Sequence, residues 1–198
     1  MSKNLILASS SISRKTIMKN SGVRFIVVKP NVDEREVEKS LSPSDRSNSE
    51  KIALILAEKK ALEVSSRYPQ FFVIGCDQTM CLENSIYHKP DNMIKAEEHL
   101  LALSGKTHRL SSAYVLVKDS KVLRYHISVA QLTMHNISQK FIKHYLKKIG
   151  EKALVSIGSY QVDKEGIQLF SSIKGDYFTI VGLPITELLN DLRKEKIL

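Results

Sequence analysis

The β-prone apolar run Phe71–Ile74, which leads directly into Gly75-Cys76-Asp77, limits more than any other feature what this chain can fold into. Aromatic and β-branched residues in succession leave no polar face, so the run predicts an internal strand buried on both faces. Such a strand needs helices on both sides of its sheet, as in α/β proteins. No apolar run in the sequence is long enough to span a membrane.

Strand-like runs alternate with segments of helical spacing, and this alternation favours a mixed, twisted α/β sheet with helices on both faces. The predicted strands are residues 5–8, 25–28 and 71–74, with a hairpin of 110–117 and 122–134. The predicted helices are residues 12–20, about 47–65, 93–103, one capped by Ser138, and one opened by Pro184 as its first-turn proline. Residues 31–50 are polar and predict a loop that becomes a helix near Ser47. We expect a single domain over 1–198, with a more irregular, smaller lobe within about 80–150.

The charge balance favours anionic partners but does not identify one. The 198 residues include 30 Lys and Arg against 21 Asp and Glu, a formal net charge of +9. The same charge also serves colloidal stability. The densest basic stretch, residues 140–152, predicts the solvated face of a helix that buries Phe141, Tyr145 and Ile149. No nucleic-acid signature is present, so nucleic acid is an unlikely partner. Two cysteines cannot form a disulfide scaffold, which suits a reducing cytoplasm.

Asp77 is the sharpest candidate for chemistry. A carboxylate that directly follows a buried strand stands at the carboxyl end of a parallel sheet, where open α/β sheets bind ligands. There it could hold a divalent metal or orient a water molecule. Asp77 could equally cap a turn, and its position alone does not decide between the two.

A hydroxyl-rich turn with Ser9 and Ser11 precedes the first predicted helix, and Arg14 lies in the first turn of that helix. The free amides and partial positive charge of a helix N-terminus suit a phosphate, and an arginine can add bidentate contacts. A plain serine cap would show the same pattern, because the turn lacks the glycine-rich fingerprints of known phosphate loops.

Lys60, Lys89 and Glu34 are three further charged candidates. Lys60 lies beside a stripe of alanines that predicts a helix packed tightly on the sheet, and it either snorkels or points at an anion. Lys89 is held extended by the proline that follows it and reads alone as surface. Glu34 adds a second carboxylate in the predicted loop, where acidic residues are usually solvated.

Eight motifs in order resemble the Maf and Maf-like nucleoside triphosphate pyrophosphatases, over nearly the whole chain. They are Leu7-Ala8-Ser9-Ser10-Ser11 with Arg14, Val32-Asp33-Glu34, Lys60-Ala61, Gly75-Cys76-Asp77-Gln78, Lys89-Pro90, Ser104-Gly105-Lys106-Thr107-His108, Gly158-Ser159-Tyr160-Gln161, and Gly175-Asp176-Tyr177 with Val181-Gly182-Leu183-Pro184. The resemblance implies two lobes around a central cleft, a cytoplasmic homodimer, and dependence on Mg²⁺ or Mn²⁺. It also implies hydrolysis of nucleoside triphosphates, including modified ones, to the monophosphate and pyrophosphate.

The same resemblance implies the roles of individual residues. Asp77, Glu34 and Lys60 become catalytic, and Asp77 and Glu34 hold the metal. The implied substrate-binding residues are Ser9, Ser11, Arg14, Lys89, Gln78 and Gln161.

Departures from the common family pattern leave the favoured base open. Ile12 and Ser13 replace the Pro-Arg that often precedes the matching arginine. Gln78 resembles the 7-methyl-GTP branch, whereas Tyr160-Gln161 resembles the dTTP/UTP branch. A second class of function also stays open: a nucleotide- or nucleic-acid-binding regulator of cell division or septum formation that does not turn over its ligand.

Overall fold

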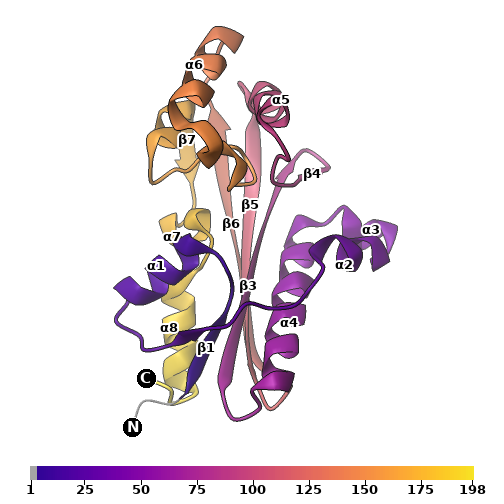
Figure 1. Ribbon diagram of the computed structural model, residues 1–198, viewed down its shortest axis with the longest axis vertical. Helices are drawn as coiled ribbons and strands as arrows, with labels where there is room; N and C mark the ends of the chain where they lie inside the picture. The colour runs from indigo at the N-terminus through magenta and orange to yellow at the C-terminus, as the bar shows by residue number, and fades with distance from the viewer. Residues whose placement is uncertain (1–3) are drawn as a thin grey trace.

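A computed structural model, which describes residues 4–198, shows a seven-stranded mixed sheet with helices on both faces (Figure 1). The strands are β1 (Leu5–Ala8), β2 (Ile26–Val27), β3 (Phe72–Leu82), β4 (Ser85–Tyr87), β5 (Thr107–Lys118), β6 (Lys121–Met134) and β7 (Phe170–Lys174). Their order is β2-β1-β3-β5-β6-β7, and β4 pairs with β3. β1 runs parallel to β2 and β3, and the other pairs are antiparallel. The predicted α/β fold class is confirmed.

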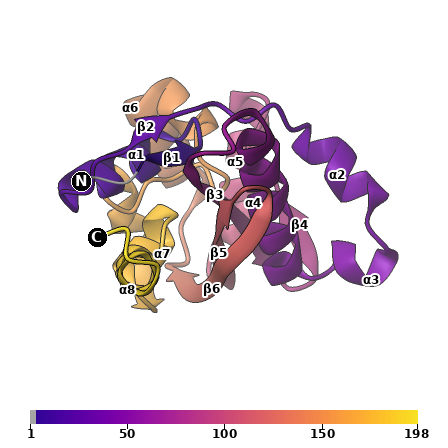
Figure 2. The same cartoon turned by 90° about the horizontal axis from the view of Figure 1, so that it is seen from below.

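The helices divide between the two faces of the sheet and its far end (Figures 1 and 2). They are α1 (Ile12–Asn20), α2 (Glu34–Ser40), α3 (Pro43–Arg46), α4 (Ser49–Arg67), α5 (Met93–Leu103), α6 (Gln139–Ile149), α7 (Tyr177–Val181) and α8 (Ile185–Lys194), with 3-10 turns η1 (Gly150–Leu154) and η2 (Glu165–Leu169). In Figure 2, α4 lies on one side of β3 and β5, and α1 and α8 lie on the other. Within residues 4–198, no helix combines the length and apolar character that a membrane crossing requires.

Three apolar clusters follow this division. One packs the alanines of α4 against β1, β3 and β5, and a second packs α1 and α8 on the opposite face. The third joins α5, α6 and η1 to the far ends of β3, β5 and β6. Strands β3 and β5 contribute buried side chains to all three clusters. The single domain over 1–198, with a smaller lobe near 80–150, stays a prediction, and residues 1–3 lie outside the described part.

Strand β3 differs from the prediction in its length. The sequence predicts that it ends before Gly75-Cys76-Asp77, but it continues to Leu82 because β5 pairs with it from Val73 to Cys81. Asp77 therefore lies within a strand, and the reading of Asp77 as a turn cap is wrong. The parallel pairing with β1 does stop where expected, at Ala8 and Gly75.

Gly75 explains why the break was predicted and why it does not occur. A Cβ atom on Gly75 would lie 2.1 Å from the carbonyl oxygen of Ala57 and 2.6 Å from the amide nitrogen of Ala61. The glycine is thus required by the close approach of α4 to β3 and not by a turn. The tight packing of the alanine stripe on the sheet, predicted from the sequence, is confirmed.

Other boundaries also depart from the prediction. Residues 31–50 form α2, α3 and the start of α4, because Asp33 and Ser42 cap two short helices that bury no residue and so show no apolar periodicity. In α6, Phe141 is exposed on the solvent side, since the buried face turns through Ile142 and Leu146. The second strand is shorter than predicted. Pro184 caps α8 without a side-chain bond, one position before the predicted one.

Candidate active site

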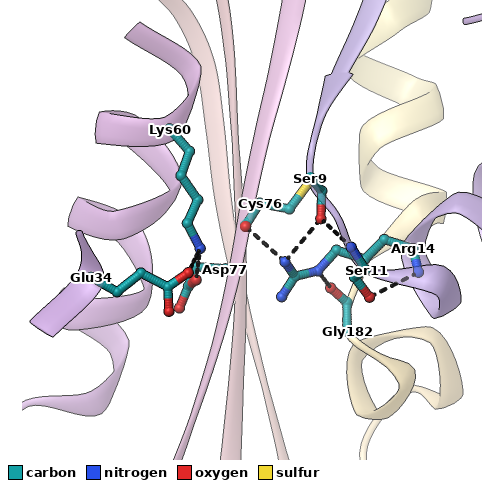
Figure 3. Close-up of polar contacts among 8 residues, drawn as sticks. All are labelled: Ser9, Ser11, Arg14, Glu34, Lys60, Cys76, Asp77 and Gly182. Atoms are coloured by element: carbon teal, nitrogen blue, oxygen red, sulfur yellow. Dashed lines mark hydrogen bonds and ion pairs between the residues drawn. The ribbon is translucent and has the colours of Figure 1, made fainter. Parts of the chain in front are cut away.

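Lys60, Glu34 and Asp77 form an ion-pair cluster on one side of β3 (Figure 3). The Nζ atom of Lys60 lies 2.5 Å from Asp77 Oδ1 and 2.5 Å from Glu34 Oε1. The side chains of Lys60 and Asp77 are each 8% exposed, and that of Glu34 is 54% exposed. Of the two readings of Lys60, the anion-directed one is therefore correct, because its ammonium is held by two carboxylates and does not snorkel to solvent.

Three separate elements supply the cluster. Gly75 lets α4 lie close to β3, and Asp77, two residues further along the strand, points to the same face as Gly75. Lys60 on α4 then reaches Asp77 directly. Glu34 is the first residue of α2, a helix capped by the side chain of Asp33. The prediction that Glu34 lies in a loop is therefore wrong. Glu34 is distant in sequence from Lys60 and Asp77, so only the fold brings it close to them.

The two carboxyl groups have opposite pKa shifts. Burial raises the pKa of Asp77, although Lys60 and Arg14 act against this. Burial also acts to raise the pKa of Glu34, but the attraction of Lys60, with that of Lys89 and Arg14, outweighs it, so the pKa of Glu34 is lowered. Neighbouring carboxyl groups pushed apart in pKa are typical of sites where one acts as a base and the other stays ionised. Burial thus dominates at Asp77, and the nearby positive charges dominate at Glu34.

Arg14 forms a second cluster on the other side of β3 (Figure 3). Its Nε donates to the carbonyl oxygen of Gly182 at 2.9 Å, and its Nη1 donates to that of Cys76 at 2.8 Å and to Ser9 Oγ at 3.4 Å. Ser11 caps α1, and its Oγ accepts from the amide of Arg14 at 3.4 Å. Arg14 Nη2 makes no hydrogen bond within the described part of the chain, which leaves two donors for a ligand.

The two clusters flank a gap in the edge of β3. β5 pairs along one edge of this strand, so β1 and β4 share the other edge. β1 pairs with β3 as far as Gly75, and β4 pairs with it from Met80 onward, so no strand of the described chain covers residues 76–79 on that edge. Asp77 lies at this gap. Asp77 therefore lies just beyond the carboxyl end of β1 but within β3, and a ligand site at this position stays a prediction.

Gln78 is held by the protein itself. Its Nε2 donates to Ser112 Oγ at 2.9 Å and to the carbonyl oxygens of Thr179 and Ile180, each at 3.0 Å. These bonds tie β3 to α7, and the Gln78 amide also lies next to Gly182 in the turn that receives Arg14. The amide nitrogen is thus committed to protein oxygens, and a role of Gln78 toward a base stays a prediction.

Lys89 and Gln161 lie in different surroundings. Lys89 is exposed after β4, and its charge contributes to the lowered pKa of Glu34, so it belongs to the electrostatic field of the cluster. Gln161 borders a small hollow lined by Tyr145 and Gly166, among others, at the far end of the molecule. No contact in the described residues joins Gln161 to Asp77. Its substrate-binding role remains a prediction.

Glu38 is a member of the site that the sequence analysis missed. It stands one helical turn after Glu34 on α2, the charges of Asp77 and Glu34 act on its carboxyl group, and its carboxylate lies 3.6 Å from His88 Nε2. Burial raises the pKa of Glu38. The spacing of Glu34 and Glu38 signals a shared face only if residues 34–40 are helical, and the loop prediction hid this.

The carboxylates of Glu34 and Asp77 are also the groups of this cluster that could bind a divalent metal. Among residues 4–198, no three His, Cys, Asp or Glu side chains are arranged to hold a metal. Glu34 and Asp77 supply two hard oxygen groups, and Mg²⁺ is commonly bound by one or two carboxylates together with substrate phosphates. The two carboxylates therefore fit a metal whose remaining ligands come from a phosphorylated substrate. They do not make a complete site alone.

Fold and site together define an α/β protein whose paired carboxylates and cations suit a phosphorylated ligand. A family model described as Maf-like protein matches residues 4–195, and the chain belongs to that family. A protein of Mesorhizobium japonicum named "7-methyl-GTP pyrophosphatase" is 51% identical over 98% of this chain and 96% of its own length. A "Nucleoside triphosphate pyrophosphatase" of Nitrobacter hamburgensis is 40% identical over 99% and 96%.

Among solved structures, a "Nucleoside-triphosphatase / dITP/XTP pyrophosphatase" from Mycobacterium abscessus is similar with a TM-score of 0.43. It is 13% identical, and the match covers 98% of this chain and 95% of that one. A likeness at this level carries no information about the activity of the present chain.

Proposed function

We propose that this protein is a nucleoside triphosphate pyrophosphatase, which hydrolyses the bond between the α- and β-phosphates to give a nucleoside monophosphate and pyrophosphate. The observation that carries the proposal is the buried ion-pair cluster of Glu34, Lys60 and Asp77, with Arg14 across the open edge of β3. The family and the names of the relatives support the same activity.

Each charged group has a task in this reaction. Asp77, whose carboxyl pKa is raised by burial, orients the attacking water and accepts its proton as the water bonds to the α-phosphorus. Arg14, Lys60 and Lys89 neutralise the triphosphate and the charge that grows on the leaving pyrophosphate. The hydroxyl groups of Ser9 and Ser11 add donors at the start of α1.

A divalent ion, Mg²⁺ or Mn²⁺, would be held by Glu34 and Asp77 and by the substrate. When bound, it would neutralise phosphate oxygens and lower the pKa of a coordinated water. An ordinary aspartate is a weak base at neutral pH, so Asp77 works better on such an activated water than on bulk solvent. Dependence on a divalent ion is part of the proposal.

We further propose 7-methyl-GTP as the favoured substrate. The relatives with about half of their residues identical carry that name, and Gln78 stands where this branch has glutamine. Gln161 points instead to the dTTP/UTP branch, so both kinds of base belong in the test.

A pyrophosphate-release assay tests the proposal. Purified protein is given 7-methyl-GTP, GTP, dTTP, UTP, CTP and pseudo-UTP, with Mg²⁺ or Mn²⁺ and with a chelator. We expect metal-dependent release, fastest with 7-methyl-GTP. No release from any triphosphate, together with a melting temperature raised by nucleotide, would instead support the binding regulator without turnover. Binding of DNA that weakens steeply with salt would support the nucleic-acid form of that alternative.

A cytoplasmic homodimer is also proposed, on the family resemblance alone. Light scattering of the purified protein measures the mass in solution, and a monomer at working concentrations would contradict the dimer.

A further inference from the structure

Lys60 occupies the place that a cation would take between Glu34 and Asp77. Its Nζ is 2.5 Å from an oxygen of each carboxylate, and its side chain is 8% exposed. Asp77 is equally buried, so its negative charge would be costly without a positive partner. Lys60 therefore performs in the nucleotide-free protein the charge compensation that is commonly left to a metal ion.

A free divalent ion cannot simply join this arrangement. Mg²⁺ needs near-octahedral oxygen ligands at about 2.0–2.1 Å, and an ammonium group offers only donors. Lys60 contacts one oxygen of each carboxylate. An ion that bound the second oxygens would lie beside the ammonium, and an ion that displaced Lys60 would leave the ammonium nearby, so either arrangement places like charges together. In exchange, it would gain only the two carboxylates, because no larger ligand set exists among residues 4–198.

A triphosphate changes both the ligands available to the ion and the charge around Lys60. Its oxygens complete the coordination of the ion, and its negative charge offers Lys60 a new acceptor. Arg14 Nη2 and exposed Lys89 add positive charge around the same anion. Metal and nucleotide then bind together. When the ion is alone, the ligands it gains do not compensate for the loss of the ion pairs with Lys60.

We propose that Lys60 is the resident cation of the Glu34–Asp77 pair and keeps divalent ions off both carboxylates until a triphosphate brings the metal. This inference rests on the proposed function and deepens it, because it makes the metal–nucleotide complex, and not the free nucleotide, the species that the site recognises. Lys60 thereby guards the site against metal capture in the absence of substrate.

The test measures metal binding without turnover. Mn²⁺ is titrated into nucleotide-free protein, and the electron paramagnetic resonance signal of the free ion is followed. For wild type we expect no binding that depends on Glu34. Lys60→Met should bind one Mn²⁺ at least about tenfold more tightly than wild type. Adding Glu34→Gln to Lys60→Met should abolish that gain.

A neighbouring lysine provides the control. Lys59 is exposed on the same helix and makes no ion pair within residues 4–198, so Lys59→Met removes the same net charge without touching the carboxylates. It should behave as wild type. In a second arm, Mn²⁺ and an α,β-methylene nucleoside triphosphate are added to wild type, and enhanced water-proton relaxation should report protein-bound metal.

Three results would overturn the inference. Wild type could bind one Mn²⁺ that Glu34→Gln removes, folded Lys60→Met could show no gain, or wild type could form no ternary complex with the methylene analogue. If Lys60→Met does not fold, the comparison of wild type with Glu34→Gln still decides. Pyrophosphate release is measured separately: its absence would overturn the proposed activity, whereas nucleotide-independent Mn²⁺ binding with normal release would overturn only the role of Lys60.

Discussion

Lys60 and His108 are two buried basic side chains in contact with the same sheet, and the fold treats them differently. Lys60 is ion-paired with Glu34 and Asp77. His108 on β5 faces a phenol instead, with its Nε2 2.6 Å from the hydroxyl oxygen of Tyr160. Burial lowers the pKa of His108 to about 4, so this side chain is neutral at neutral pH.

The difference shows where the molecule maintains charge in its interior. Around His108 the neighbours are aromatic and apolar, and neutrality is the low-energy solution. Around Lys60 three charges are kept together, although an apolar cluster of similar volume would often be as stable or more so. Charges that stability does not require are a mark of chemistry, and this contrast supports the proposal that the Lys60 cluster is the active site.

Replacing Asp77 in the Lys60 cluster should have the largest effect on activity. Asp77→Asn keeps the size of the side chain but cannot accept a proton, so we expect pyrophosphate release to fall by about 10²–10⁴ while the protein stays folded. Assays of release and circular dichroism check the two halves of this statement. A folded variant that retains a large fraction of the activity would remove Asp77 from the chemistry and weaken the contrast with His108.

The neutrality of His108 predicts a pH dependence of stability. Histidine in an unfolded chain has a pKa near 6.5, against about 4 in the fold. Between these values the unfolded chain binds the extra proton, so the stabilisation is complete above pH 6.5 and is lost as the pH falls toward 4. The shift corresponds to roughly 2–4 kcal/mol.

Urea unfolding of wild type and His108→Gln at neutral pH and at about pH 4.5 isolates this contribution. The stability advantage of wild type should shrink at the lower pH. His144 is exposed on α6, so His144→Gln serves as the control and should follow wild type. An advantage that does not change with pH would mean that His108 is not the group that titrates.

Gly75→Ala should disturb the charged region and spare the neutral one. The new methyl group would lie 2.1 Å from the carbonyl oxygen of Ala57, so α4 must shift and carry Lys60 away from Asp77. We expect a loss of about 1–3 kcal/mol in the free energy of unfolding, with reduced pyrophosphate release. Urea titration and the release assay measure both. Unaltered stability would show that the contact of α4 with β3 is looser than this geometry.

The smallest effect concerns the partner of His108. Tyr160→Phe removes the hydroxyl group and leaves the buried Nε2 of His108 without its hydrogen bond, which should cost about 1 kcal/mol of unfolding free energy. Tyr125 is 64% exposed on β6, and Tyr125→Phe is the matched control with no expected loss. Equal stabilities of the two variants would show that the hydrogen bond to Tyr160 contributes nothing net.

Much of the architecture could be predicted from the sequence because its signals are local. The apolar run after residue 70, the serine cap of α1 and the alanine stripe of α4 each reflect a short-range preference for strand, cap or close-packed helix. Asp77 and Arg14 could also be identified from the sequence, because Asp77 closely follows the apolar run and Arg14 lies in the first turn after the serine cap. The resemblance in motif order added Gln78 and Gln161 as candidates and implied the roles of the others.

The rest depended on contacts between distant segments. The course of β3 past Gly75 was decided by pairing with β5, and the two short helices after Asp33 are held by caps and not by an apolar face. The surroundings of Gln78 also depend on distant contacts, because its amide donates to carbonyl oxygens of α7, about one hundred residues later.

The sequence by itself determined which residue types were available for chemistry and the order of strands and helices that carries them. Only the tertiary structure decided that Lys60 meets Glu34 and Asp77, while Gln161 lies apart from them. The physical reason is that local preferences act over a few residues, whereas an ion pair between α2, α4 and β3 requires the packing of α4 at Gly75 to bring three distant segments together.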